Sequence, residues 1–316
     1  MTTAEMQEKI KLIIEKEFGV STFAVLKEAE GFSLVKFILD DNLCKTVKDM
    51  FTEIFQNQFL CDEAELDKAE NIDDNRHVFY EILQNEDYNP FGFLSTYSDV
   101  TISYSEACLN QLMGFAFRFN VNDNYIWIYQ QINYPQLINK SKNVYAILSG
   151  LSGNPIYSQL DKDILKIERK IDFLIIGNSI ITYQIKLLQR CFQFETYVRN
   201  EAKKTVDIIS EMDIVDGLDR FVALGDQKSL TNARKLVKAK NSPVLRMNKA
   251  TLIQKLDTLP RYKGKFEIKD EKIVVNNQKQ AIEFIKMLND SILKSELTDA
   301  EYDSTVKTEL EPLKQA

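Results

Sequence analysis

The spacing of apolar residues changes twice along the chain, and this constrains the fold more than any other feature. Residues 3–18 and 42–59 place apolar side chains at helical spacing. Between residues 77 and 194 the spacing becomes that of strands, and the last third is helical again. The sequence therefore predicts an α+β fold, in which a mostly antiparallel sheet is flanked by helices.

Short turn sequences divide the strand-like segments. Glu30-Gly31, Asn122-Asp123-Asn124 and Gly177-Asn178 have the composition of tight turns. An acidic, polar stretch at residues 62–75 is predicted to be a solvated loop. The expected strands are residues 22–27, 32–39, 114–121, 125–132, 164–171 and the two sides of Gly177-Asn178 within 172–188.

Charge is unevenly distributed. The whole chain has a net charge of −7 and a pI of about 5.1, which argues against general binding to nucleic acid or membrane surfaces. Residues 1–110 carry 9 Lys and Arg against 22 Asp and Glu, a balance of −13. Residues 225–272, the basic segment, carry 13 against 5, a balance of +8. Such segregation indicates an interaction surface, although two oppositely charged faces that dock on each other would also produce it.

The basic segment is expected to belong to a C-terminal module. We divide the chain into an N-terminal domain, residues 1–224, and a helical module, residues 225–316, whose order of elements is that of a winged helix-turn-helix. The expected elements are a helix at 229–240, a break at Asn241-Ser242-Pro243, a helix at 248–259, a hairpin of 265–269 with 272–275, and a helix that Asn277 caps.

The cations of this module mostly fall outside the apolar stripes of its helices. Lys and Arg side chains on one surface bind phosphates and release counterions, which makes binding salt-sensitive and independent of base sequence. The sequence thus predicts a grip on duplex DNA, and the alternative is a set of ordinary solvated cations. The predicted DNA-binding residues are Arg234, Lys235, Lys238, Lys240, Arg246, Lys249, Lys255, Arg261, Lys263 and Lys265.

Catalytic motifs are scarce. The four cysteines form no CxxC pair and the chain has one histidine, so neither a metal site nor a cofactor is predicted. One arrangement resembles a Mg²⁺-dependent nuclease core: Asp172, then Gln184 and Lys186 across a hairpin. Gln184 stands where a second acid is usual, and Glu168 compensates only in part. A plain hairpin is the favoured interpretation, and no catalytic residue is predicted.

Several short segments in roughly residues 75–310 carry a resemblance to a known family, and the C-terminal run is the most specific of them. The segments are Lys170-Ile171-Asp172-Phe173, Phe192 to Tyr197, Asn241-Ser242-Pro243-Val244-Leu245, Lys272-Ile273-Val274-Val275, Met287-Leu288-Asn289-Asp290, Lys294-Ser295-Glu296-Leu297-Thr298 and Tyr302. In these segments the chain resembles the bacterial KwaB family, which is named for the B subunit of the Kiwa anti-phage system.

The resemblance implies a defence protein that binds DNA without a catalytic centre. It also implies a homodimer in a larger assembly with the membrane-embedded Kiwa A subunit. The chain itself shows no signal peptide, and its longest apolar run, residues 173–182, is too short to span a bilayer. We therefore expect a cytoplasmic protein that reaches the inner membrane through its partner. An adaptor that assembles by charge complementarity is a further alternative.

Overall fold

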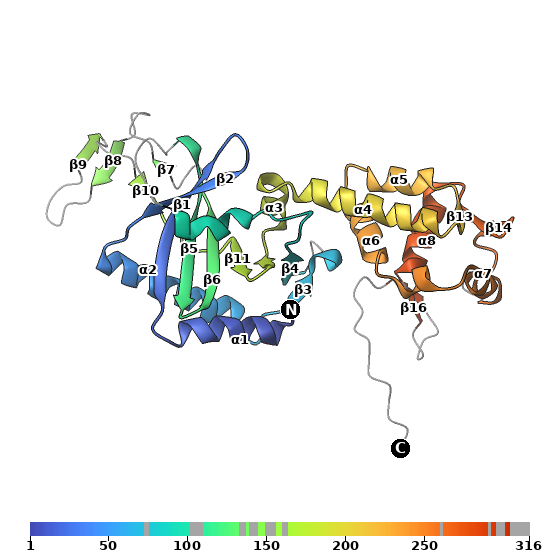
Figure 1. Cartoon of the computed structure of the whole chain (residues 1–316), viewed down its shortest axis with the longest axis horizontal. Helices are drawn as coiled ribbons and strands as arrows, with labels where there is room; N and C mark the ends of the chain where they lie inside the picture. The colour runs from blue at the N-terminus through green and yellow to red at the C-terminus, as the bar shows by residue number, and fades with distance from the viewer. Residues whose placement is uncertain are drawn as a thin grey trace, which may run out of the picture. The chain divides into compact units, whose positions relative to one another are not determined.

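The chain forms two compact units in the computed structural model (Figure 1). The first comprises residues 1–67 and 77–185, and the second comprises residues 68–76 and 186–316. The structure describes residues 1–72, 76–100, 110–132, 166–259 and 262–289, with the backbone of short strands at 137–138, 145–148, 156–159, 164–165, 292–294 and 301–303.

An eight-stranded sheet forms the centre of the first unit. The strand order is β2-β1-β5-β6-β11-β12-β4-β3, and every neighbouring pair from β2 to β4 is antiparallel. The expected hairpins around Glu30-Gly31, Asn122-Asp123-Asn124 and Gly177-Asn178 are present. The strands are β1 (Gly19–Lys27), β2 (Phe32–Phe37), β3 (Leu66–Lys68), β4 (Phe79–Leu83), β5 (Leu112–Val121), β6 (Asn124–Gln131), β11 (Phe173–Ile176) and β12 (Ser179–Thr182).

Two helices cover one face of this sheet (Figure 1). Helix α1 (Thr3–Ile14) begins at a capping box between Thr2 and Glu5. Helix α2 (Asp41–Ile54) is capped by Asp40 and continues as a π-helical turn, Phe55–Phe59, so the expected helix at 42–59 is two elements. Phenylalanines from the π-helical turn, α2 and β5 pack into the core, where burial of aromatic area stabilises the unit.

The predicted strands around residues 164–188 are partly wrong. Only Ile164–Leu165 (β10) is a strand within 164–171, and it pairs with Leu137–Ile138 (β7). Beyond β12, the Thr182 hydroxyl accepts a hydrogen bond from the Gln184 N–H, and helix α3 (Ile185–Cys191) follows where a strand to Leu188 was expected. The other short elements are η2 (Ala69–Asn71), η3 (Gly92–Asp99), β8 (Tyr145–Leu148), β9 (Ile156–Gln159), β16 (Ile292–Lys294) and β17 (Glu301–Asp303).

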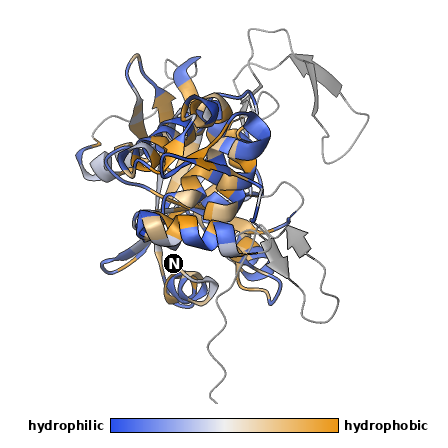
Figure 2. Cartoon of the chain, turned by 90° about the vertical axis from the view of Figure 1, so that its right-hand side faces the viewer, coloured by the Kyte–Doolittle hydropathy of each residue, from blue (hydrophilic) through white to orange (hydrophobic). Residues whose placement is uncertain are grey.

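The second unit combines amphipathic helices with a small sheet (Figure 2). The helix–break–helix–hairpin order expected after residue 225 is confirmed, and so is the α+β class of the chain. The helices are α4 (Phe194–Glu211), α5 (Asp219–Gly225), α6 (Thr231–Ala239), η7 (Pro243–Arg246), α7 (Lys249–Thr258) and α8 (Gln278–Leu288). The strands are β13 (Val215–Asp216), β14 (Glu267–Lys269) and β15 (Lys272–Val274).

Residues upstream of the basic segment are part of the same unit. Helices α4 and α5 pack against α6, and β13 pairs in parallel with β15. The antiparallel β14–β15 hairpin turns through Asp270 and Glu271, both at positive φ, as a tight hairpin turn requires. The sequence-based boundary between residues 224 and 225 therefore falls inside the second unit, because tertiary packing joins α4 and α5 to the module.

The passage from β13 to α5 depends on a glycine. Gly217 has φ +98, and a Cβ atom there would collide with the carbonyl oxygen of Val275. We expect Gly217→Ala to lower the free energy of unfolding by about 2–4 kcal/mol, through backbone strain and this collision. Gly264→Ala is the matched control, because Gly264 has φ +74 with open space around it, and should cost about 1 kcal/mol. Equal losses in urea unfolding would contradict the close approach.

Candidate nucleic-acid interface

Helix α6 turns its cations toward neighbouring elements more than the sequence suggests. Ala233, Leu236 and Ala239 are fully buried, and the helix packs against α4, α5, α8 and η2. Its predicted DNA-binding residues are all half-buried; they are Arg234, Lys235, Lys238 and Lys240. A helix packed on several sides has only a narrow solvent-facing strip, so these side chains lie along the borders of the packed surface.

The most buried charge near α6 is a carboxylate. Glu201 of α4 is 7% exposed and accepts hydrogen bonds from Lys240 and Lys204, each at 2.8 Å. Burial opposes its ionisation, but the hydrogen bonds from the two lysines outweigh burial and lower the pKa of Glu201. Lys240 therefore neutralises a buried acid within the unit instead of projecting freely toward a ligand.

Lys249 and Lys272 share a second acid. Lys272 Nζ donates a hydrogen bond to Asp213, and Lys249 Nζ lies 3.7 Å from the other carboxylate oxygen. The bond from Lys272 is the main cause of the lowered pKa of Asp213. The Asp213 side chain is exposed, so its ion pairs with Lys272 and Lys249 stabilise the fold little. Both lysines remain near the surface.

Four predicted cations remain exposed, and we call them the exposed cation group: Arg246, Lys255, Lys263 and Lys265. They occupy one continuous stretch of chain from the end of η7, through α7, to the turn before β14. This backbone is ordered by the Asn248 cap on the Ala250 N–H at 2.9 Å. In the turn, the Lys263 N–H bonds Leu259 O at 3.0 Å and the Lys265 N–H bonds Tyr262 O at 2.9 Å.

The stretch of chain that carries this group is basic on balance and not uniformly so. Asp257 is exposed within it, and Glu267 is exposed just beyond it at the start of β14. Leu252 and Leu256 are buried on the other side of α7, which keeps Lys255 on the solvent side of the helix. Arg261, the remaining predicted cation, lies outside the described residues. What this arrangement can do chemically is attract and hold phosphates, since Lys and Arg side chains donate charge-assisted hydrogen bonds to phosphate oxygens.

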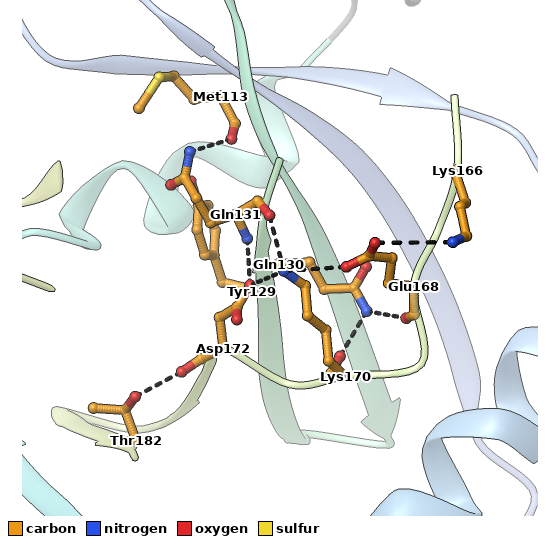
Figure 3. A network of polar contacts seen from close by, with 9 residues as sticks. All are labelled: Met113, Tyr129, Gln130, Gln131, Lys166, Glu168, Lys170, Asp172 and Thr182. Carbon is orange, nitrogen blue, oxygen red and sulfur yellow. Dashed lines mark hydrogen bonds and ion pairs between the residues drawn. The ribbon is translucent and has the colours of Figure 1, made fainter. Parts of the chain in front are cut away.

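Two of the nuclease-like residues, Asp172 and Glu168, take part in a polar network of the first unit (Figure 3). Lys170 Nζ lies 3.1 Å from Asp172 Oδ2 and 3.4 Å from Glu168 Oε2, and donates to Gln131 O at 3.2 Å. Asp172 also accepts the Gln131 N–H at 2.8 Å. Asp172 is only 5% exposed, and a buried carboxylate is costly unless it is paired. Lys170 and the backbone N–H of Gln131, in the adjacent strand β6, supply that pairing.

A glutamine anchors the same loop. Gln130 is fully buried, and its Nε2 donates to the carbonyl oxygens of Glu168 and Lys170, both at 2.6 Å. These bonds replace the strand pairing that was expected for residues 164–171 and hold the irregular chain against β6. The network therefore has a structural role: it holds residues 168–172, which lead into β11, against β6.

Gln184 and Lys186 depart from the strand geometry that the nuclease hypothesis requires. Both side chains are exposed; Gln184 follows the end of β12 and Lys186 lies in the first turn of α3. Among the residues that the structure describes, no group of three His, Cys, Asp or Glu side chains could hold a metal ion.

The sequence analysis did not predict Glu201 and Asp213, the acids that pair with several of the predicted DNA-binding cations. Glu201 follows Phe194 and Val198 by seven and three positions, so it stands within the apolar stripe of α4. A charged residue at such a position indicates a buried charge with a partner, and this signal was available in the sequence. Asp213 stands at positive φ after the end of α4 and carries no comparable signal.

Comparisons with known proteins agree on one family. The family model described as Kiwa protein KwaB-like matches residues 109–298. A curated relative, the Kiwa protein KwaB of Escherichia coli O55:H7 (strain RM12579 / EPEC), is 21% identical over 327 residues, covering 98% of this chain and 100% of the relative. No solved structure matches the chain. The family match includes both the Lys170–Asp172 network and the whole basic segment.

The buried Asp172 predicts a pH dependence of stability. Burial raises the pKa of Asp172, while Lys170 and the Gln131 N–H oppose the rise and Glu168 adds to it. Because the folded state binds this proton more tightly than the unfolded state, the group favours folding more as pH falls through the folded pKa. The stability of the parent relative to Asp172→Asn should therefore increase between about pH 7.5 and about pH 4.5. Urea unfolding of both proteins measures this; a constant difference would contradict the raised pKa.

Proposed function

The chain belongs to the Kiwa KwaB-like family, whose namesake is a component of an anti-phage defence system, and on this premise we propose that it is the DNA-binding effector of such a system. It grips the backbone of duplex DNA without preference for base sequence and performs no catalysis of its own. Binding of this kind would let the protein obstruct replication or transcription of phage DNA.

One observation carries the proposal: the described residues of the basic segment keep four cations, the exposed cation group, at the surface. Arg246, Lys255, Lys263 and Lys265 are all exposed. Each cation that meets a phosphate releases counterions, so four contacts give a slope of about −3.6 for the logarithm of the binding constant against that of salt. Such a surface attracts DNA even though the whole chain is acidic, because screening limits the reach of distant charges.

The same premise supports a partner at the membrane. No helix among the described residues is long and apolar enough to cross a bilayer. We infer that the chain works as a cytoplasmic homodimer held at the inner membrane by the membrane-embedded Kiwa A subunit. Its size in solution, measured with and without that subunit, tests the assembly; a chain that stays monomeric in both would contradict it.

Charge reversal tests the DNA-binding surface. The variant replaces the exposed cation group by glutamate at Arg246, Lys255, Lys263 and Lys265. Its Kd for a short duplex of arbitrary sequence should rise at least about tenfold at ~0.1 M salt. The slope of the logarithm of its binding constant against that of salt should become less negative.

The matched control reverses four exposed lysines of the first unit, Lys9, Lys11, Lys16 and Lys27, which changes the net charge equally. Its Kd should stay within about threefold of the parent, since charges that are not part of the contact act on the DNA only through screened fields. Equal losses in the two variants would show a general charge effect and contradict the surface. Cleavage of the duplex by the parent with Mg²⁺ or Mn²⁺ would contradict the non-catalytic role.

A further inference from the structure

An arginine on the large sheet of the first unit lacks an anionic partner. Arg118 lies on β5 between Phe117 and Phe119, which pack with α2, so its side chain is on the opposite face of the sheet. It is half-buried, and among the described residues it forms no hydrogen bond and no ion pair. Its Nε atom is buried without an acceptor. Because a partly buried cation is costly unless it is paired, this position indicates a missing anion.

Two tyrosine rings hold this guanidinium in place. Its Cζ atom lies 4.3 Å from the centre of the Tyr97 ring and 4.6 Å from the centre of the Tyr125 ring. Tyr97 belongs to η3 and Tyr125 to β6. Aromatic rings attract a cation to their faces, but they accept none of its N–H hydrogen bonds as an oxyanion would. The rings therefore fix the guanidinium in advance, which reduces the entropy that is lost when an acceptor binds.

Two further polar side chains share this face of the sheet. Ser21 of β1 lies directly across from Arg118 in the β1–β5 register, and Asn120 follows Arg118 by two positions on β5. Side chains in such positions point to the same face and lie within about 5–8 Å of one another. Both are half-buried, and neither side chain forms a hydrogen bond among the described residues. A hydroxyl, an amide and a guanidinium thus converge with their donors free.

This set of donors favours a phosphate over a carboxylate. A guanidinium alone can satisfy both oxygens of a carboxylate, whereas a phosphate group has further oxygens for a hydroxyl and an amide. The site also offers an open aromatic surface, since Tyr125 is 44% exposed and contacts no other aromatic ring in the described part of the chain. Such a ring can stack on a nucleobase. A phosphate next to a planar base is the chemistry of a nucleotide.

We propose that Arg118, together with Ser21 and Asn120, forms a binding site for the phosphate of a nucleotide. Arg118 donates two parallel hydrogen bonds to phosphate oxygens, the other two side chains donate to the remaining oxygens, and the base stacks on Tyr125. The ligand is a free nucleotide or the phosphorylated end of a nucleic acid strand, which share this chemistry. The site belongs to the first unit, so it goes beyond the DNA grip proposed for the exposed cation group and does not depend on it.

The single tryptophan of the chain reports on this site. Trp127 lies across from Arg118 in the β5–β6 register, and its ring centre is 5.6 Å from that of Tyr97. Titration of the full chain with adenosine monophosphate, followed by tryptophan fluorescence and by calorimetry, should show saturable binding. Adenosine, which lacks the phosphate, should bind at least about tenfold more weakly, because the charge-assisted hydrogen bonds are lost.

Two substitutions test the residues. Arg118→Lys keeps the charge but loses the parallel N–H groups, so it should raise the Kd for adenosine monophosphate at least about tenfold. Ser21→Ala leaves Arg118 in place and should raise it about three- to tenfold. The matched control is Arg169→Lys, because Arg169 is an exposed arginine of the same unit that pairs with Glu53; its Kd should stay within about twofold of the parent. Thermal melts check the fold, and if Arg118→Lys fails to fold, Ser21→Ala decides.

Dinucleotides with and without a 5′-phosphate separate the two sources of ligand. Tighter binding of the phosphorylated dinucleotide than of adenosine monophosphate identifies a strand end, and the reverse identifies a free nucleotide; either result supports the site. Reversal of the exposed cation group should leave binding of adenosine monophosphate unchanged, and a loss there would overturn the site. It is also overturned if the parent binds no adenosine monophosphate, if adenosine binds equally well, if folded Arg118→Lys and Ser21→Ala both bind like the parent, or if an acidic peptide binds more tightly.

Discussion

The packing of α6 against α4 determines which charges of the C-terminal unit face solvent. Ala233, Leu236 and Ala239 bury one side of α6, and Glu201 places a carboxylate beneath its end. A buried carboxylate is costly unless it is paired, so Lys240 and Lys204 are drawn to it. This constraint makes one half of the basic segment structural and leaves the other half, from η7 to the turn before β14, at the surface.

The first unit uses charge differently. Its core is aromatic, and a polar cluster around Lys170 and Asp172 fastens an irregular chain to β6 through side chains instead of strand pairing. Asp172 therefore has a role in positioning β11 that requires neither a metal nor catalysis. Asp172, Gln184 and Lys186 have the spacing of a nuclease core in the sequence. In the structure, β12 ends before Gln184 and Lys186 lies in α3, so the strand that this core requires is absent there.

Periodicity and turn composition predicted the α+β class, the three hairpins of the first unit, the caps at Asn248 and Asn277, and the order of elements in the module. These features depend on neighbours in sequence. The direction of Lys240 could not be predicted, because the Glu201 carboxylate that holds it is 39 positions away in the sequence. The same holds for the boundary of the second unit, which depends on α4 and η2 packing against α6. The helix at residues 185–191 was missed because its apolar residues also fit an alternating strand.

Amide hydrogen exchange of the full chain, with and without a short duplex, locates the contact most directly. Binding of DNA by the exposed cation group should slow exchange across residues 243–269, where η7, α7 and the turn before β14 carry those side chains. The protection should disappear as salt is raised, in step with the loss of affinity. Protection confined to the first unit, or none across residues 243–269 while DNA is bound, would contradict the assignment of the DNA grip to this stretch.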